Sequence, residues 1–293
     1  MLKALLRIFA SLPLPVVHGL GVMLGYLYFL LFRRRLRRTR RNLRWIRNSL
    51  SHRDYRRLLH ASIRETGKGI LETLAIWFRP DASILKLVRD CKGWEHVEAA
   101  HAKGRGIIFL TPHLGCYEIT AIYYASRHPI SVLFKPPRNP KLGKLVEEGR
   151  KRNGITLAPT NMSGVRTLLK TLRKGDAVGI LPDQVPDENE GEWASFFGRQ
   201  AYTMTLVGKL AASTGATVLL AFGERLPLGR GYIIHIEPLD PDGKLTATPT
   251  PQDVNDGIER LVRQCPEQYL WSYGRFKRPS LAIQCILHLS PAF

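Results

Sequence analysis

The chain has 293 residues, with 44 Lys or Arg against 24 Asp or Glu and a formal net charge of +20. This length allows one large domain or two small ones with a full hydrophobic core. The charge balance indicates an anionic partner: nucleic acid, a membrane surface or a phosphorylated substrate. The four cysteines have neither close pairing nor metal-ligand spacing, so they are interpreted as reduced cytosolic thiols.

The N-terminal stretch 8–32 contains no Asp, Glu, Lys or Arg. Its length is sufficient to cross a bilayer, which needs about 20 apolar residues. Pro13 and Pro15 are expected to break it and to leave a helix of roughly 17 residues from Val16. A cleaved signal peptide is disfavoured because no small-x-small cleavage site follows the apolar run. A buried helix of a soluble protein is the other alternative.

A strongly basic segment follows directly. Residues 33–68 hold fourteen Lys or Arg and two acids, so they carry +12 of the total charge. Cationic residues beside an apolar helix belong on the cytoplasmic side, where anionic headgroups attract them. We therefore expect an N-terminal membrane-anchoring helix at residues 1–32, a basic, helical juxtamembrane region at 33–92, and a cytoplasmic body at 93–279. An apolar tail, 280–293, ends the chain.

Within the juxtamembrane region, apolar residues near a 3.6-residue period predict a helix over 54–78. Short β-branched runs then alternate with helical patterns. Strands are expected at 106–111, 131–135, 177–182, 217–223 and 232–239, and helices near 117–126, 140–152, 163–174 and 201–213. This alternation predicts an α/β fold, a mixed sheet flanked by helices. A polar loop is expected over 186–203, at a strand end where such sheets bind ligands.

The stretch "TPHLGCYE" (111–118) follows the first of these strands and carries the main candidate for chemistry. His113 is expected in the loop, and Glu118 in the first turn of the next helix. On one continuous helix the two side chains would diverge by about 140°, so they meet only if the chain turns at Gly115. A carboxylate bonded to one imidazole nitrogen fixes the tautomer and makes the other nitrogen a general base.

Three other interpretations of this stretch remain open. In the first, His113 is a loop residue that caps a helix or bonds the backbone and has no catalytic role. In the second, Cys116 is a thiol nucleophile with His113 as its base, although no oxyanion-hole or elbow pattern surrounds it. The third, a metal site, is disfavoured because no second His or acid stands at ligand spacing.

The order of four blocks resembles one enzyme family. His113-x4-Glu118 after an apolar strand resembles the His-x4-Asp/Glu motif of the glycerolipid acyltransferase superfamily. Three later stretches are similar to blocks of the late lipid A biosynthesis acyltransferases: "FKPPRNPKLGKLVEEGRKRNG" (134–154), "ILPDQVPDENEGEWASFFGRQAYT" (180–203) and "PEQYLWSYGRFKRP" (266–279). The apolar N-terminal segment followed by the basic residues 33–68 also resembles the N-terminal anchor of that family. The resemblance covers about residues 1–279.

The resemblance implies a reaction and its participants. A fatty acyl chain passes from an acyl carrier protein thioester to a hydroxyl of a lipid A precursor, without metal or other cofactor. His113 would be the general base and Glu118 would orient it, a role worth roughly 10²–10⁴-fold in rate. Arg138 would hold a phosphate, and Arg150 would do the same or lie on a solvated helix face. The enzyme would sit at the inner membrane, facing the cytoplasm.

The third block supplies the remaining candidates. Asp183, Phe197 and Gly198 would shape the acceptor or acyl pocket, against alternatives of a capping carboxylate and ordinary core packing. Glu118 departs from the Asp that many lipid A members carry, and the tail 280–293 extends past the closing block. Rival functions are acylation of another membrane glycolipid or aminolipid, an inactive scaffold of this fold, and a membrane-tethered nucleic-acid-binding protein. Against the last, no RNA- or DNA-binding signature occurs.

Overall fold

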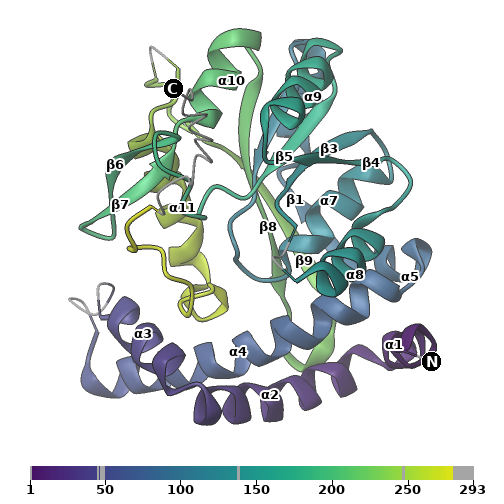
Figure 1. Cartoon of the computed structure of the whole chain (residues 1–293), viewed down its shortest axis with the longest axis vertical. Helices are drawn as coiled ribbons and strands as arrows, with labels where there is room; N and C mark the ends of the chain where they lie inside the picture. Colours follow the sequence, from purple (N-terminus) through teal and green to yellow (C-terminus); the bar gives the residue numbers. More distant parts are fainter. Residues whose placement is uncertain (1, 45, 47–49, 137–138, 246–247, 280–293) are drawn as a thin grey trace, which may run out of the picture.

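A computed structural model describes residues 2–44, 46, 50–136, 139–245 and 248–279. Its centre is a mixed seven-stranded sheet flanked by helices (Figure 1), as the sequence predicts. All strand pairs are parallel except the antiparallel pair β8–β9. In spatial order the strands are β1 (Val88–Lys92), β9 (Tyr232–Pro238), β8 (Thr217–Arg225), β2 (Ile107–Leu110), β5 (Ala177–Ile180), β3 (Ile130–Phe134) and β4 (Ile155–Pro159).

Five of these strands are the expected ones, while β1 and β4 escaped prediction. Strand β1 pairs with β9, so the sheet begins before residue 93. The loop expected over 186–203 is wrong in its second half, where β6 (Gly191–Phe196) and β7 (Arg199–Met204) form an antiparallel hairpin. Phe197 and Gly198, with φ of 49° and 71°, make its turn. Two left-handed residues suit the twist of a tight hairpin. Helix α10 accordingly begins at 206, not at 201.

The sheet is buried on both faces. Successive side chains of its central strands therefore point alternately into two hydrophobic cores. Ile108, Leu110 and Phe222 belong to one core, and Ile107 and Phe109 to the other. The first core is covered by α9 (Met162–Arg173), α10 (Leu206–Thr214) and α11 (Pro251–Gln264). The second is covered by α6 (Trp94–Ala102) and α7 (Tyr117–Ala125).

The N-terminal helices form a layer along one edge of the molecule (Figure 1). They are α1 (Leu2–Ser11), α2 (Leu14–Leu31), α3 (Arg33–Leu43), α4 (His52–Phe78) and the short α5 (Asp81–Leu85). The break between α1 and α2 falls at Pro13, as expected, and Pro15 is accommodated in the first turn of α2. Among the described residues α2 is the one helix long and apolar enough to cross a membrane. The tail 280–293 lies outside the described residues.

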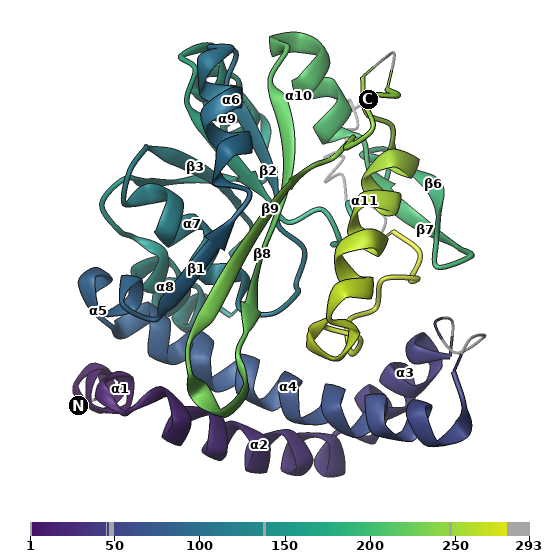
Figure 2. The ribbon, with the colours of Figure 1, turned by 180° about the vertical axis from the view of Figure 1, so that it is seen from behind.

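Helix α4 joins this layer to the sheet. Gly21 and Gly25 of α2 lie against Gly67 of α4 so closely that a Cβ on any of them would overlap backbone atoms of the other helix. On the other side, the β8–β9 hairpin reaches down to α2 and α4 (Figure 2). There the buried Arg225 of β8 bonds the buried Glu72 of α4. Small residues and one buried ion pair therefore fix the position of α2 relative to the sheet.

Candidate active site

The candidate site lies where the carboxyl ends of β2 and β5 meet. These strands are parallel neighbours, with Leu110 opposite Ile180, so the loops that follow them run side by side. The loop after β2 turns at Gly115, whose φ of 57° confirms the expected turn. The backbone N–H of Gly115 donates to the carbonyl of Gln268, and that of Cys116 to the carbonyl of Gly223. Contacts from β8 and from the 266–279 segment thus hold the histidine loop.

His113 is paired with a carboxylate, but not with the expected one. Its Nδ1 lies 2.8 Å from Oδ1 of Asp183, and its backbone N–H donates to Oδ2 of the same side chain at 2.9 Å. Asp183 is buried, and the His113 side chain is 14 % exposed. Because the carboxylate accepts from Nδ1, the tautomer with a free Nε2 is favoured. The amide nitrogen of Gln184 lies 3.4 Å from that Nε2.

Glu118 bonds Arg150 instead. The Arg150 Nε lies 3.0 and 3.1 Å from the two carboxylate oxygens, and its terminal nitrogen lies 2.5 Å from Oε1. In the part of the chain that the structure describes, no hydrogen bond joins Glu118 to His113. The expectation that Glu118 orients the imidazole is therefore corrected: Asp183 occupies that place. Arg150 is likewise engaged with a carboxylate rather than standing open to a phosphate or lying on a solvated face.

The Asp183 carboxylate and the Arg150 guanidinium keep their charges in a largely buried setting. Burial alone would raise the pKa of Asp183, but the neighbouring His113 and its hydrogen bonds hold that pKa below its ordinary value. Burial likewise opposes the charge of Arg150, and Glu118 outweighs it and raises the pKa of the guanidinium. At neutral pH the site therefore contains a carboxylate beside the imidazole and a buried arginine–carboxylate pair.

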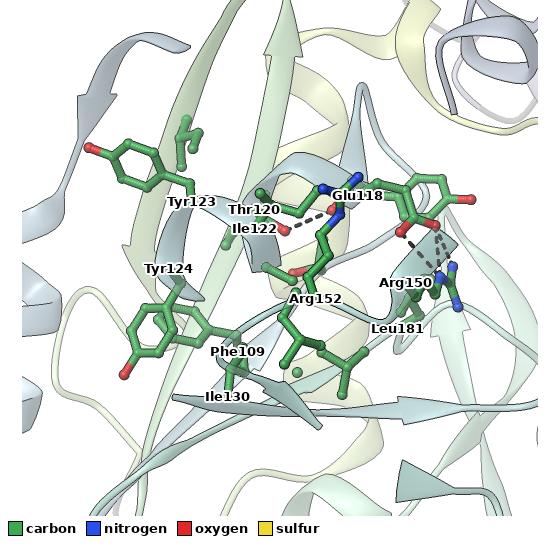
Figure 3. Close-up of a pocket in the computed structure, with 18 of the residues that line it drawn as sticks. Phe109, Glu118, Thr120, Ile122, Tyr123, Tyr124, Ile130, Arg150, Arg152 and Leu181 are labelled. Carbon is green, nitrogen blue, oxygen red and sulfur yellow. Dashed lines mark hydrogen bonds and ion pairs between the residues drawn. The ribbon is translucent and has the colours of Figure 1, made fainter. Parts of the chain in front are cut away.

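A pocket extends from the Glu118–Arg150 pair between α7, α8 (Pro140–Arg150) and the sheet (Figure 3). Apart from the ion pair and Arg152, its walls are mostly apolar and aromatic. They include Phe109, Ile130, Val132, Tyr124 and the backbone of Gly179. An apolar pocket with polar groups at a few places is typical of a small-molecule or acyl-chain site.

The other predicted residues fall in different places. Arg138 lies outside the described residues. Phe197 is buried beside Trp271, and Gly198 follows it in the hairpin turn; neither lines the pocket. Asp183 does belong to the site, as the partner of His113. Sequence reasoning missed Gln184, although its place beside Asp183 in the third block was a usable signal. It also missed Tyr273, whose ring is nearly parallel to the imidazole, with 6.5 Å between the ring centroids.

A thiol or metal mechanism finds no support in this geometry. Cys116 is buried, and burial raises the pKa of its thiol well above the ordinary value, so the thiol stays protonated at neutral pH. Among the described residues no group of three or more His, Cys, Asp or Glu side chains could hold a metal ion.

The sequence matches the family model described as bacterial lipid A biosynthesis acyltransferase over residues 1–278. The chain belongs to this family. Among its curated relatives is a lipid A biosynthesis lauroyltransferase of Escherichia coli K12. It is 29 % identical over 269 residues, which span 91 % of this chain and 87 % of that protein. A lipid A biosynthesis palmitoleoyltransferase of the same organism is 26 % identical over 278 residues, spanning 93 % and 88 %.

A lipid A biosynthesis myristoyltransferase of the same organism is 27 % identical over a shorter stretch, 62 % of this chain and 57 % of that protein. The names of these three relatives differ in the acyl chain that each one transfers. Membership in the family makes this chain an acyltransferase of lipid A biosynthesis.

Proposed function

We propose that this lipid A acyltransferase transfers a fatty acyl chain from an acyl carrier protein thioester to a hydroxyl of a lipid A precursor, with His113 as the general base. The observation that carries the mechanism is the His113–Asp183 pair, with Nδ1 bonded to the carboxylate and Nε2 3.4 Å from the amide nitrogen of Gln184.

The transfer requires one proton to move twice. Nε2 of His113 takes the proton of the acceptor hydroxyl as its oxygen attacks the thioester carbonyl carbon. The carbon–sulfur bond then breaks, and the imidazolium returns the proton to the departing thiolate. Asp183 stabilises the imidazolium between these two steps and holds the ring in one tautomer. No acyl-enzyme forms, because the nucleophile belongs to the acceptor.

The apolar pocket is assigned to the acyl chain of the donor. Its walls of Phe109, Ile130 and Val132 offer hydrocarbon contacts along its length. Burial of about ten methylene groups would contribute roughly 8 kcal/mol to donor binding. The Glu118–Arg150 pair, at the polar end, is assigned to the thioester end of the chain. Its role is to keep that end of the pocket open and shaped, since a buried pair resists separation.

The same proposal places the enzyme at the cytoplasmic face of the inner membrane. Acyl carrier protein is a soluble cytoplasmic donor, and lipid A precursors are membrane lipids. The basic helix α3 and the apolar helix α2 adjoin each other at one edge of the molecule, which suits a position between the two substrates.

Purified full-length protein, acyl carrier protein thioesters of several chain lengths and a tetra-acylated lipid A precursor test this function together. Mass spectrometry should show one added acyl chain on the precursor and stoichiometric release of the carrier thiol. The same reaction with another membrane glycolipid or an ornithine lipid serves as control. Preferential acylation of one of those acceptors, or use of coenzyme A thioesters with no use of the carrier protein, would contradict the proposal.

A further inference from the structure

The exposed surface of α2 is apolar along its whole length. Its buried residues, Leu14, Val17, His18, Gly21, Gly25 and Phe29, follow one helical stripe that faces α4. The opposite stripe is exposed and is formed by Val16, Leu20, Met23, Leu27 and Leu30, which are 43–70 % accessible. Of the thirteen exposed large hydrophobic residues in the described part of the chain, nine lie between Ile8 and Phe32. This surface is far too apolar and too contiguous to face water.

A tenth exposed residue extends the same surface. Leu228, at the tip of the β8–β9 hairpin, is 83 % exposed. The next residue, Gly229, lies against the backbone of Pro15 at the start of α2. The hairpin tip therefore presents its leucine beside the apolar face of α2, although the two are far apart in the sequence (Figure 2).

Basic side chains border this surface. On α4, Arg53, Arg57, His60 and Arg64 recur at helical spacing, and all are exposed. The His60 ring lies 6.3 Å from that of Tyr26, so this basic row runs alongside α2. At the carboxyl end of α2, the arginines of α3 extend this basic row. An apolar stripe edged by cations matches a leaflet with anionic headgroups, where apolar side chains enter and cations stay at the headgroups.

A spanning orientation conflicts with how α2 is held. Helix α4 runs along α2 and carries Arg53, Arg57, Arg64 and the Glu65–Lys68 pair. If α2 crossed the bilayer as packed here, these charges would enter the hydrocarbon, which is strongly unfavourable. Separating the helices instead would expose the glycine contacts and break the buried His18–Glu72 hydrogen bond of 3.1 Å. Helix α1 is tied to the same side, since Arg79 donates to the carbonyls of Ala10 and Leu12.

We infer that α2 lies in the plane of one leaflet, with its apolar stripe and Leu228 inserted and with the basic row of α4 on anionic headgroups. Helix α4 and the 267–270 segment then lie between the leaflet and the active site. The Ser62 hydroxyl of α4 donates to the Glu267 carbonyl, and the Leu270 N–H donates to the His113 carbonyl. The inference does not depend on the acyl donor.

The position of the N-terminus distinguishes the two orientations. Sealed inside-out inner-membrane vesicles carrying full-length protein with an N-terminal epitope are treated with protease. The in-plane orientation predicts that the epitope is digested together with the catalytic body. An epitope that is protected while the body is digested would show that α2 spans, and would overturn the inference.

Binding to lipid vesicles tests whether the apolar face of α2 and the basic row of α4 contact a lipid leaflet. Replacing Arg53, Arg56, Arg57 and Arg64 with Gln should weaken binding to phosphatidylglycerol-containing vesicles at least about tenfold, because each surface cation contributes a few-fold. The matched control replaces four exposed cations at the far end of the molecule, three on α9 and one at its C-cap: Arg166, Lys170, Arg173 and Lys174. This control should lose less than about twofold. Equal losses, or no loss, would contradict a specific lipid face, whatever the enzymatic activity of the variants.

The apolar stripe has its own matched pair. Leu27→Asp should strongly reduce binding to the same vesicles, whereas Met162→Asp, at a still more exposed position at the start of α9, should not. Circular dichroism checks that both variants fold. If Leu27→Asp binds lipid as the unaltered protein does but disrupts a dimer or a complex with an acidic protein, the occupant of this face is not a leaflet.

Discussion

Glu72 is expected to make the stability of the enzyme depend on pH in a defined window, and Glu72→Gln tests this. Its carboxylate is buried and accepts from Arg225 Nε at 2.8 Å, from the Tyr232 hydroxyl at 3.0 Å and from His18 Nε2 at 3.1 Å. Burial opposes its ionisation, but Arg225 above all lowers its pKa from 4.5 to about 2. Each pKa unit corresponds to about 1.4 kcal/mol, so this carboxylate contributes roughly 3 kcal/mol to the free energy of unfolding.

The stabilising contribution of the Glu72 carboxylate is present at neutral pH and is lost in acid, because the pKa of Glu72 is lowered in the folded protein. Since the folded pKa lies below the unfolded one, the contribution is complete above about pH 4.5 and is lost as pH falls toward 2. Glutamine cannot ionise, so the stability difference between the unaltered protein and Glu72→Gln should shrink by roughly 3 kcal/mol across this window. Urea unfolding in detergent, followed by circular dichroism between pH 3 and 7, measures the trend.

An exposed carboxylate provides the control. Glu147 of α8 is half exposed, and its Oε1 lies 3.5 Å from Nζ of Lys151. Glu147→Gln should change the free energy of unfolding by less than about 1 kcal/mol at any pH. A Glu72→Gln difference that stays constant from pH 7 to pH 3 would refute the reasoning, because it would mean that Glu72 titrates alike in the folded and unfolded chains.

Three further outcomes are expected at the site, each measured as acyl transfer from carrier protein thioester to lipid A precursor. Asp183→Asn should lower kcat by about 10²-fold or more while changing donor KM little, because the amide no longer fixes the His113 tautomer; loss in KM alone would argue against this role. Cys116→Ser should retain near-normal turnover, and a trapped acyl-thioester would refute a hydroxyl nucleophile. Gly179→Ala should shift donor preference toward shorter chains, because the new methyl would meet Val132 only at ordinary contact distance, 3.4 Å, and narrow the pocket; an unchanged preference would place the chain elsewhere.

The sequence predicts the central elements of the fold because their patterns are strong. The run 106–111 is short, apolar and followed by a turn, and it forms the central strand β2. The hairpin β6–β7 was missed because its side chains alternate irregularly, "GEWASF", and its turn uses a phenylalanine at positive φ rather than Asn or Asp. Strand β1, "VRDCK", was missed because it is mostly polar and partly exposed.

The partner of His113 could not be predicted for a different reason. Asp183 is seventy residues away and reaches the imidazole only because β2 and β5 are neighbours in the sheet. Strand order depends on tertiary packing and is not written in the local pattern. Glu118, five residues from His113, was the nearer candidate, but helix α8 brings Arg150 to it. The histidine itself was predictable because it follows a buried strand at the edge where such sheets bind ligands.

The role of His113 as general base is tested most directly by comparing His113→Ala with His235→Ala. His235 also bonds a carboxylate, Glu224, at 2.8 Å, but it lies on strand β9, outside the loop that joins β2 to α7. Initial rates of acyl transfer from carrier protein thioester to lipid A precursor are measured for both variants, with folding checked by circular dichroism. We predict a loss of about 10²-fold or more for His113→Ala and nearly unchanged turnover for His235→Ala. Near-normal turnover in a folded His113→Ala enzyme would contradict the mechanism.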